Sequence, residues 1–133
     1  MSNLLGINSD VNTLSPLTLS FVGDSVYDLL VRQYLVSLAN RPVKELNQMK
    51  VTLVNCKSQA QSAKHIMEYL TDTELDVYKR GRNVKVNSVS KHSSIADYHS
   101  ATGLEALFGY LYLSGNTERI KELFTLILSK NEV

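Results

Sequence analysis

The chain has 133 residues, a formal net charge of +1 and 44% hydrophobic residues, the size and composition of one globular domain. No apolar run approaches the roughly 20 residues that a membrane-spanning helix needs, and the polar N-terminus lacks the pattern of a secretory signal. The single cysteine, Cys56, excludes an internal disulfide and argues against a structural zinc site. We therefore expect a cytoplasmic protein with no membrane partner.

A long helix is predicted first. Ser15 can cap it and Pro16 suits its first position, where the missing N–H does no harm. Apolar residues then recur at three- and four-residue steps and predict a wide apolar face that ends near Ala39. They are Leu17, Phe21, Val22, Val26, Leu29, Leu30, Tyr34, Leu35 and Leu38. Pro42 ends this helix, because the residue before a proline avoids helical angles.

Further helices are predicted through the middle of the chain. One begins at Val43, and another covers about residues 58–70. Thr71 and Glu74 match a capping box, which starts a short helix that Gly81 can close. Residues 82–96 show neither helical nor strand periodicity, so we predict a long surface loop there, which in a compact domain is usually functional.

Two helices complete the predicted fold. One begins around residues 98–102 and ends at Ser114, and Asn116 caps the last. Strand-like alternation is absent throughout the sequence. We therefore predict an all-α fold made of one domain over residues 1–133, with residues 1–13 as a candidate for a loosely ordered N-terminus.

Basic residues cluster in the predicted loop and just before it. They are Lys79, Arg80, Arg82, Lys85 and Lys91, and no Asp or Glu occurs between positions 77 and 96. Such a segment in a nearly neutral protein could contact phosphate groups. A solvated loop explains the same charges equally well at this point.

Two carboxylates stand out because apolar residues flank them. Asp24 follows Gly23 inside the first helix, where both residue types are unfavourable, and Glu105 lies between Leu104 and Leu107. Two such acids on two helices could share a hard divalent cation, which prefers oxygen ligands. Alternatively, Asp24 simply faces water. If Asp24 is considered without Glu105, we favour this explanation.

Several motifs resemble the ribonuclease III family. Residues 19–27 (LSFVGDSVY) are similar to its signature helix, and residues 105–113 (EALFGYLYL) to a second helix of that family. Residues 80–83 (RGRN) and 102–113 (TGLEALFGYLYL) resemble the Mini-ribonuclease III group within it. The resemblance spans residues 14–130.

This resemblance implies an all-helical ribonuclease III-like domain that forms a homodimer through its signature helices and cleaves double-stranded RNA. It implies Mg²⁺ as cofactor, with Mn²⁺ able to substitute, and products with 5′-phosphate and 3′-hydroxyl ends. Asp24 and Glu105 would be the catalytic, metal-binding acids. Arg80, Arg82, Lys85 and Lys91 would bind RNA, since the group lacks a separate RNA-binding domain. Asp28, one turn after Asp24, is a candidate for a supporting acceptor, although an ordinary surface acid is an equal alternative.

The implied biological task is maturation of the large-subunit (23S) ribosomal RNA precursor, with a large-subunit ribosomal protein as a candidate partner. The sequence also departs from standard ribonuclease III, which has further acids where this chain has Leu17, Ser20 and Thr102. We therefore expect weak metal binding by the free protein.

Two alternative functions stay open. One is a non-catalytic RNA-binding module on the same fold, which retention of Asp24 and Glu105 argues against. The other is a helical interaction domain without an RNA role. Salt-dependent binding to duplex RNA would distinguish the second alternative from the nuclease.

Overall fold

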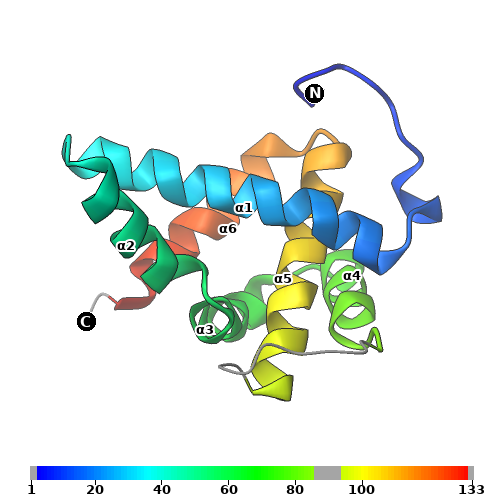
Figure 1. Ribbon diagram of the computed structural model, residues 1–133. Coiled ribbons are helices and arrows are strands. Elements are labelled where there is room, and N and C mark those ends of the chain that lie inside the picture. The colour runs from blue at the N-terminus through cyan, green and yellow to red at the C-terminus, as the bar shows by residue number, and fades with distance from the viewer. Residues whose placement is uncertain (1–2, 86–93, 132–133) are drawn as a thin grey trace.

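A computed structural model describes residues 3–85 and 94–131 of the chain (Figure 1). Within these residues all regular structure is helical, which confirms the predicted all-α fold. The helices are α1 (Pro16–Leu38), α2 (Val43–Val54), α3 (Cys56–Ile66), α4 (Asp72–Arg82), α5 (Ile95–Leu113) and α6 (Thr117–Leu128), with short 3-10 turns η1 (Val11–Thr13), η2 (Met67–Tyr69) and η3 (Ser129–Asn131). Over the described ranges, none of the helices has the length and apolarity needed to cross a membrane.

The predicted starts of α1 and α4 are confirmed by their caps. Ser15 accepts a hydrogen bond from the Thr18 backbone N–H, with Pro16 at the first helical position. Thr71 and Glu74 form the complete capping box of α4. Each cap satisfies backbone donors that the first turn of a helix leaves free, so local sequence is enough to define where these helices begin.

Three predictions about the end of α4 and the start of α5 are wrong in detail. Gly81 does not close α4; it lies buried inside the helix, which continues to Arg82. A side chain at position 81 would meet Gly103 and Ala106 of α5, so the glycine serves close helix packing. Helix α5 begins at Ile95, capped by Ser94, rather than at 98–102. The connection is therefore shorter than the predicted loop 82–96, and its residues 86–93 lie outside the described ones.

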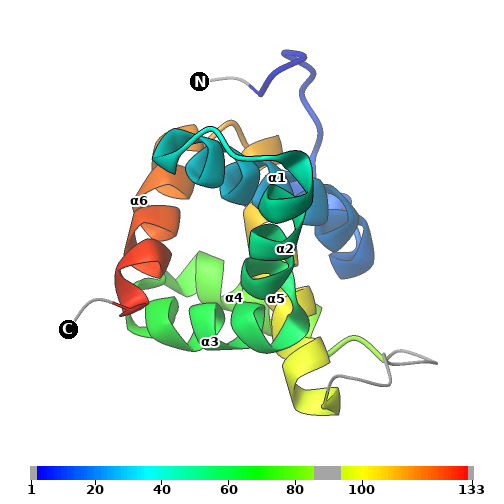
Figure 2. The same ribbon diagram turned by 60° about the vertical axis from the view of Figure 1, so that its left-hand side comes forward.

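Helix α5 is the central element. Helix α1 crosses it, while α3 and α4 pack against its N-terminal half (Figures 1 and 2). The crossing of α1 and α5 is very close, because a side chain at Gly23 would collide with the Glu105 backbone carbonyl and one at Gly109 with that of Leu19. Two glycines therefore allow the two backbones to touch.

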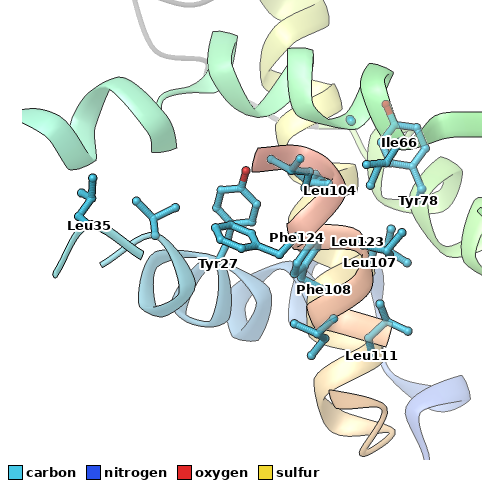
Figure 3. Close-up of a cluster of buried hydrophobic side chains, with 14 residues drawn as sticks. Tyr27, Leu35, Ile66, Tyr78, Leu104, Leu107, Phe108, Leu111, Leu123 and Phe124 are labelled. Atoms are coloured by element: carbon cyan, nitrogen blue, oxygen red, sulfur yellow. The ribbon is translucent and has the colours of Figure 1, made fainter. Parts of the chain in front are cut away.

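The main core fills the space between α1, α3, α5 and α6 (Figure 3). Tyr27 lies at its centre, with edge-to-face ring contacts to Phe108 (5.3 Å between centroids) and Phe124 (5.7 Å). Such aromatic pairs add about 0.5–1.5 kcal/mol beyond the burial of their surface. The core thus locks α1 against α5 and α6 and holds the crossing in place.

The apolar face predicted for α1 is wrong in its position on the helix. Of the predicted residues only Leu35 is fully buried, and Phe21 is 80% exposed and Leu29 58% exposed. Leu17 and Leu38 are also exposed. The residues of α1 in the core are Leu19, Tyr27, Val31 and Leu35. The helix therefore carries more apolar surface than its own chain covers.

Candidate active site

The crossing of α1 and α5 sets the positions of the two predicted catalytic acids. Gly23 lies against the backbone of Glu105, so Asp24, the next residue of α1, is held beside that part of α5. Asp24 itself is exposed, and Glu105 is half-buried. The structure therefore brings together the two carboxylates that the sequence singled out, one reaching solvent and one set into the protein.

A serine of α1 contacts the inner carboxylate. The Oγ atom of Ser20 donates a hydrogen bond to Oε1 of Glu105 at 3.2 Å, although the two residues are 85 positions apart. Ser20 is only 8% exposed. A nearly buried hydroxyl of α1 therefore supplies a hydrogen-bond donor to the carboxyl of α5.

The electrostatics of Glu105 are unusual. Burial and, next, hydrogen-bonding and charge interactions with Asp24 raise the pKa of Glu105 from 4.5 to about 8. Hydrogen bonds from Ser20 and Gln59 lower it in part. A neighbouring carboxylate and a low-dielectric surrounding both disfavour a second negative charge. A cation at this position would remove that penalty.

Gln59 was not predicted as a site residue. It lies on α3, is 4% exposed, and its side-chain amide is one of the groups that lower the pKa of Glu105. One feature of the sequence could have indicated Gln59: it is a polar residue one turn before Ala63 on the inward face of α3. The same pattern is equally typical of a helix end or of a solvent-exposed face. Ser20 of α1 donates a hydrogen bond to Glu105, and Gln59 of α3 lowers the pKa of the same carboxyl.

The available ligand atoms fit a hard divalent cation. Asp24 and Glu105 offer carboxylate oxygens, and the hydroxyl of Ser20 is close by; Mg²⁺ prefers such oxygen ligands and retains several waters. Among residues 3–85 and 94–131 there is no group of three or more His, Cys, Asp or Glu side chains arranged for a metal. A cation here would therefore depend on two carboxylates, water and substrate oxygens.

Asp28 has other partners. Its carboxylate pairs with Arg32 on the same helix at 2.6 Å and with Lys50 of α2 at 3.4 Å. These ion pairs join α1 to α2, which favours the alternative that Asp28 is a structural surface acid.

The predicted basic residues lie at the end of α4. Arg80 is exposed and pairs with Asp76 at 3.2 Å, and the guanidinium of Arg82 stacks over the Tyr78 ring at 5.7 Å. Lys85 is exposed just after the helix, and Lys91 lies outside the described residues. Because Gly81, between the two arginines, packs on Gly103 and Ala106, this end of α4 is next to the turn of α5 that carries Glu105.

Comparison with known proteins agrees with this arrangement. The Ribonuclease III domain family matches residues 17–116. That match covers α1 to α5 and includes both acids. The chain belongs to the ribonuclease III family.

Two similar relatives are both named Mini-ribonuclease 3. The chain is 46% identical over 116 residues to Mini-ribonuclease 3 of Thermoanaerobacter sp. (strain X514), an alignment covering 87% of this chain and 82% of the relative. It is 37% identical over 124 residues to Mini-ribonuclease 3 of Clostridium tetani (strain Massachusetts / E88), covering 92% and 82%. Together with the sequence motifs, these similarities confirm membership of the Mini-ribonuclease III group.

A solved structure also has a similar fold. A crystal structure of a protein from Fusobacterium nucleatum superposes with a TM-score of 0.82 at 29% sequence identity, covering 92% of this chain and 98% of that one. The similarity extends over the whole arrangement of helices and confirms the predicted fold class.

Proposed function

We propose that this ribonuclease III-family chain is an endoribonuclease that hydrolyses double-stranded RNA with Mg²⁺, for which Mn²⁺ can substitute. The observation that carries the proposal is the pairing of Asp24 and Glu105 at the α1–α5 crossing, with the pKa of Glu105 raised by burial and by Asp24. Strongly shifted carboxyl groups beside a second acid are typical of catalytic sites. Membership of the family supports nuclease chemistry at this position.

In this proposal Asp24 and Glu105 hold the metal ion. The ion, when bound, polarises the scissile phosphate and lowers the pKa of a bound water so that it can attack. With a cation held there, Glu105 would be ionised and its proton released to solvent, since a cation favours the ionised carboxylate. Ser20 holds one oxygen of that carboxyl, and the exposed Asp24 would hold the ion where a phosphate from solvent can reach it.

Arg80, Arg82, Lys85 and Lys91 are proposed to hold the RNA backbone. Arg80 and Lys85 are exposed at the end of α4, where phosphate groups can reach them. Recognition of A-form RNA depends mainly on phosphate and 2′-hydroxyl contacts, so a basic surface beside the carboxylates suits a duplex of any sequence.

The active form is proposed to be a homodimer that joins through α1. Phe21 and Leu29 lie on the same helix and are 80% and 58% exposed. Exposed apolar surface of this kind is unfavourable in water, and packing against a second copy would bury it. Phe21 is one turn from Asp24, so two such helices would set two sites beside one duplex. Sedimentation equilibrium tests this directly: Phe21→Asp should give a monomer, and an unchanged dimer would contradict the interface.

The further assignments rest on the family. We propose that the whole chain, residues 1–133, is one catalytic domain that acts in the cytoplasm on the large-subunit (23S) ribosomal RNA precursor. A large-subunit ribosomal protein is the candidate partner. Asp28 stays a candidate for a supporting acceptor; loss of cleavage in Asp28→Asn with intact folding would support that role.

The competing function is a non-catalytic RNA-binding module. The experiment incubates the protein and its Asp24→Asn variant with a long RNA duplex, with and without Mg²⁺, and analyses the products on a gel. Magnesium-dependent cutting that disappears in the variant is the expected result. Binding of the duplex without any cutting by the wild-type protein would replace the nuclease with the binding module.

A further inference from the structure

Helix α3 presents a basic face to solvent, formed by Lys57, Gln61 and Lys64. All three residues are exposed, and their spacing of four and three residues places them on one side of the helix. The helix contains no Asp or Glu. Its opposite side packs against α5. In a protein with a net charge of only +1, this outward face of α3 is therefore locally positive.

The fold does not explain these two lysines. Several other cations of the protein pair with carboxylates, namely Arg32, Arg41, Lys50, Arg80 and Arg119. Over residues 3–85 and 94–131, neither Lys57 nor Lys64 has a carboxylate oxygen within 4.0 Å. Lys64 suits the last turn of α3, but Lys57 lies in the first turn, where the helix dipole disfavours a positive charge. The stability of α3 therefore gives no reason for the basic face.

The basic face continues to the C-terminal end of the described chain. An open hollow is lined there by Gln61, Lys64, His65 and Lys130. The ammonium group of Lys130 donates a hydrogen bond to Oγ of the buried Ser62 at 2.6 Å, which fixes its positive charge at the edge of the hollow. Two ammonium groups and an imidazole offer N–H donors to one space. Phosphate oxygens are the acceptors that such a set of donors fits best.

A second hollow connects the basic face to α4. It is bordered by α3, α4 and α5 and shares Gln61 and Lys64 with the first hollow. Tyr78 of α4 lines it, together with one acid, Asp97. The guanidinium of Arg82 stacks over the ring of Tyr78 at 5.7 Å. Because Arg82 belongs to the cluster proposed to hold RNA, the basic face of α3 is continuous with that cluster.

We propose that the basic face of α3, with His65 and Lys130 at its end, is a second surface that binds the phosphate backbone of RNA. The inference rests on the proposed function, because it extends the RNA surface at the end of α4. Lys57 and Lys64 are separated by about 10 Å along the helix axis, a span that covers more than one phosphate of a duplex. An acidic protein segment would be attracted by the same charges, but continuity with the α4 cluster favours RNA.

The test compares Lys64→Gln with Lys121→Gln. Each removes one positive charge from an exposed helical lysine, and Lys121 lies on α6, away from the basic face. Glutamine retains a helix propensity close to that of lysine, and thermal unfolding establishes that the variants fold. Binding to a long RNA duplex is measured without Mg²⁺ at several salt concentrations, so that no cutting is needed. Binding to polyglutamate is measured in parallel, and the double variant Lys57→Gln/Lys64→Gln is included.

We expect Lys64→Gln to reduce the slope of log duplex affinity against log salt by about one, the double variant to reduce it by about two, and Lys121→Gln to leave it unchanged. Wild-type slopes in Lys64→Gln and in the double variant would overturn the inference, and so would a loss of polyglutamate binding alone. If the wild-type protein bound the duplex but never cut it, only the proposed nuclease function would fail. If it cut the duplex while the double variant kept the wild-type slope, only the inference would fail.

Discussion

Ser20 and Glu105 are joined by a hydrogen bond of 3.2 Å between α1 and α5. The bond exists because glycines at positions 23 and 109 let the two helix backbones touch. It places the Ser20 hydroxyl, a donor, beside the Glu105 carboxyl. Burial and the neighbouring Asp24 raise the pKa of this carboxyl to about 8. The same close crossing thus supplies both the stability of the fold and the electrostatics of the candidate site.

The raised pKa of Glu105 predicts a pH-dependent stability without metal. In the unfolded chain the carboxyl ionises near 4.5, and in the fold near 8, so folding takes up a proton between these values. The contribution of Glu105 to the free energy of unfolding is complete below about pH 4.5 and is lost as pH rises through about 8. The shift corresponds to at most about 5 kcal/mol. Thermal unfolding from about pH 5 to pH 9 should show this fall, and millimolar Mg²⁺ should reverse it.

Glu105→Gln is the control for this pH dependence. The amide carries no charge, so the variant should lose the part of the slope between about pH 5 and 8 and respond less to Mg²⁺. A slope identical to that of the wild-type protein would show that another group is responsible.

Gly23→Ala is predicted to destabilise the protein. Helix propensity alone would favour alanine by about 1 kcal/mol. The new methyl group would collide with the Glu105 carbonyl and lie 2.8 Å from the backbone N of Gly109, neither of which can move alone. We expect a net loss of about 1–3 kcal/mol or more in the free energy of unfolding, measured by denaturant titration.

Ser25→Ala is the matched control, since Ser25 is exposed on the same helix. It should be close to neutral. If Gly23→Ala instead increased the free energy of unfolding, the close crossing of α1 and α5 would be wrong.

A buried ion pair joins α4 to α6 and η2. Arg119 binds both oxygens of Glu74 at 2.9 Å, and Glu74 is 5% exposed. Arg119→Met would leave this carboxylate buried without its partner, so we expect a loss of about 3–5 kcal/mol in the free energy of unfolding. Arg80→Met, which breaks the exposed pair with Asp76, should cost no more than about 1 kcal/mol. Equal losses would contradict the difference in burial.

The same pair predicts acid sensitivity. Burial raises the pKa of Glu74, but the hydrogen bonds and charge of Arg119 and the Thr71 cap outweigh it and hold the pKa below 4.5. The contribution of Glu74 to the free energy of unfolding is therefore present above about pH 4.5. It is lost as pH falls through the lower pKa that Glu74 has in the folded protein. Acid titration of Glu74→Gln should show a smaller loss of stability below that pH than the wild-type protein, and an equal loss would exclude Glu74 as the cause.

Replacing basic residues near α4 should weaken RNA binding in a salt-dependent manner. For Arg80→Ala and Lys85→Ala, each lost phosphate contact should reduce the slope of log affinity against log salt by about one. Filter binding with a duplex at several salt concentrations measures the slope. Lys121→Ala, on α6 away from this cluster, is the control. Unchanged slopes in the first two variants would leave these residues as a solvated surface.

The sequence predicted helix starts better than helix packing. Ser15, Thr71 and Asn116 cap their helices through hydrogen bonds within a few residues, so local pattern is enough to find them. Gly81 gave the same local signal as a helix end, yet it serves contact with α5. That contact involves residues more than 20 positions away, which no local pattern contains.

The sequence predicted only part of the candidate site, because the rest depends on how helices distant in sequence pack together. Asp24 and Glu105 stand out because acids inside apolar helices need an explanation. Gln59 does not, because a glutamine in a helix is ordinary until α3 packs against α5 and buries it. Phe21 shows the opposite error: its spacing fits a core position, but the buried side of α1 carries Leu19 and Tyr27, and Phe21 is 80% exposed.

The most direct test of the account is a double-mutant cycle on Asp24 and Glu105. Single-turnover cleavage of duplex RNA with Mg²⁺ is measured for Asp24→Asn, Glu105→Gln and the double variant, each checked for folding. If both acids hold one metal ion, each single variant should lose nearly all activity, and the double variant should be no worse than either. Losses that multiply in the double variant, or full activity in either single one, would contradict a shared metal site.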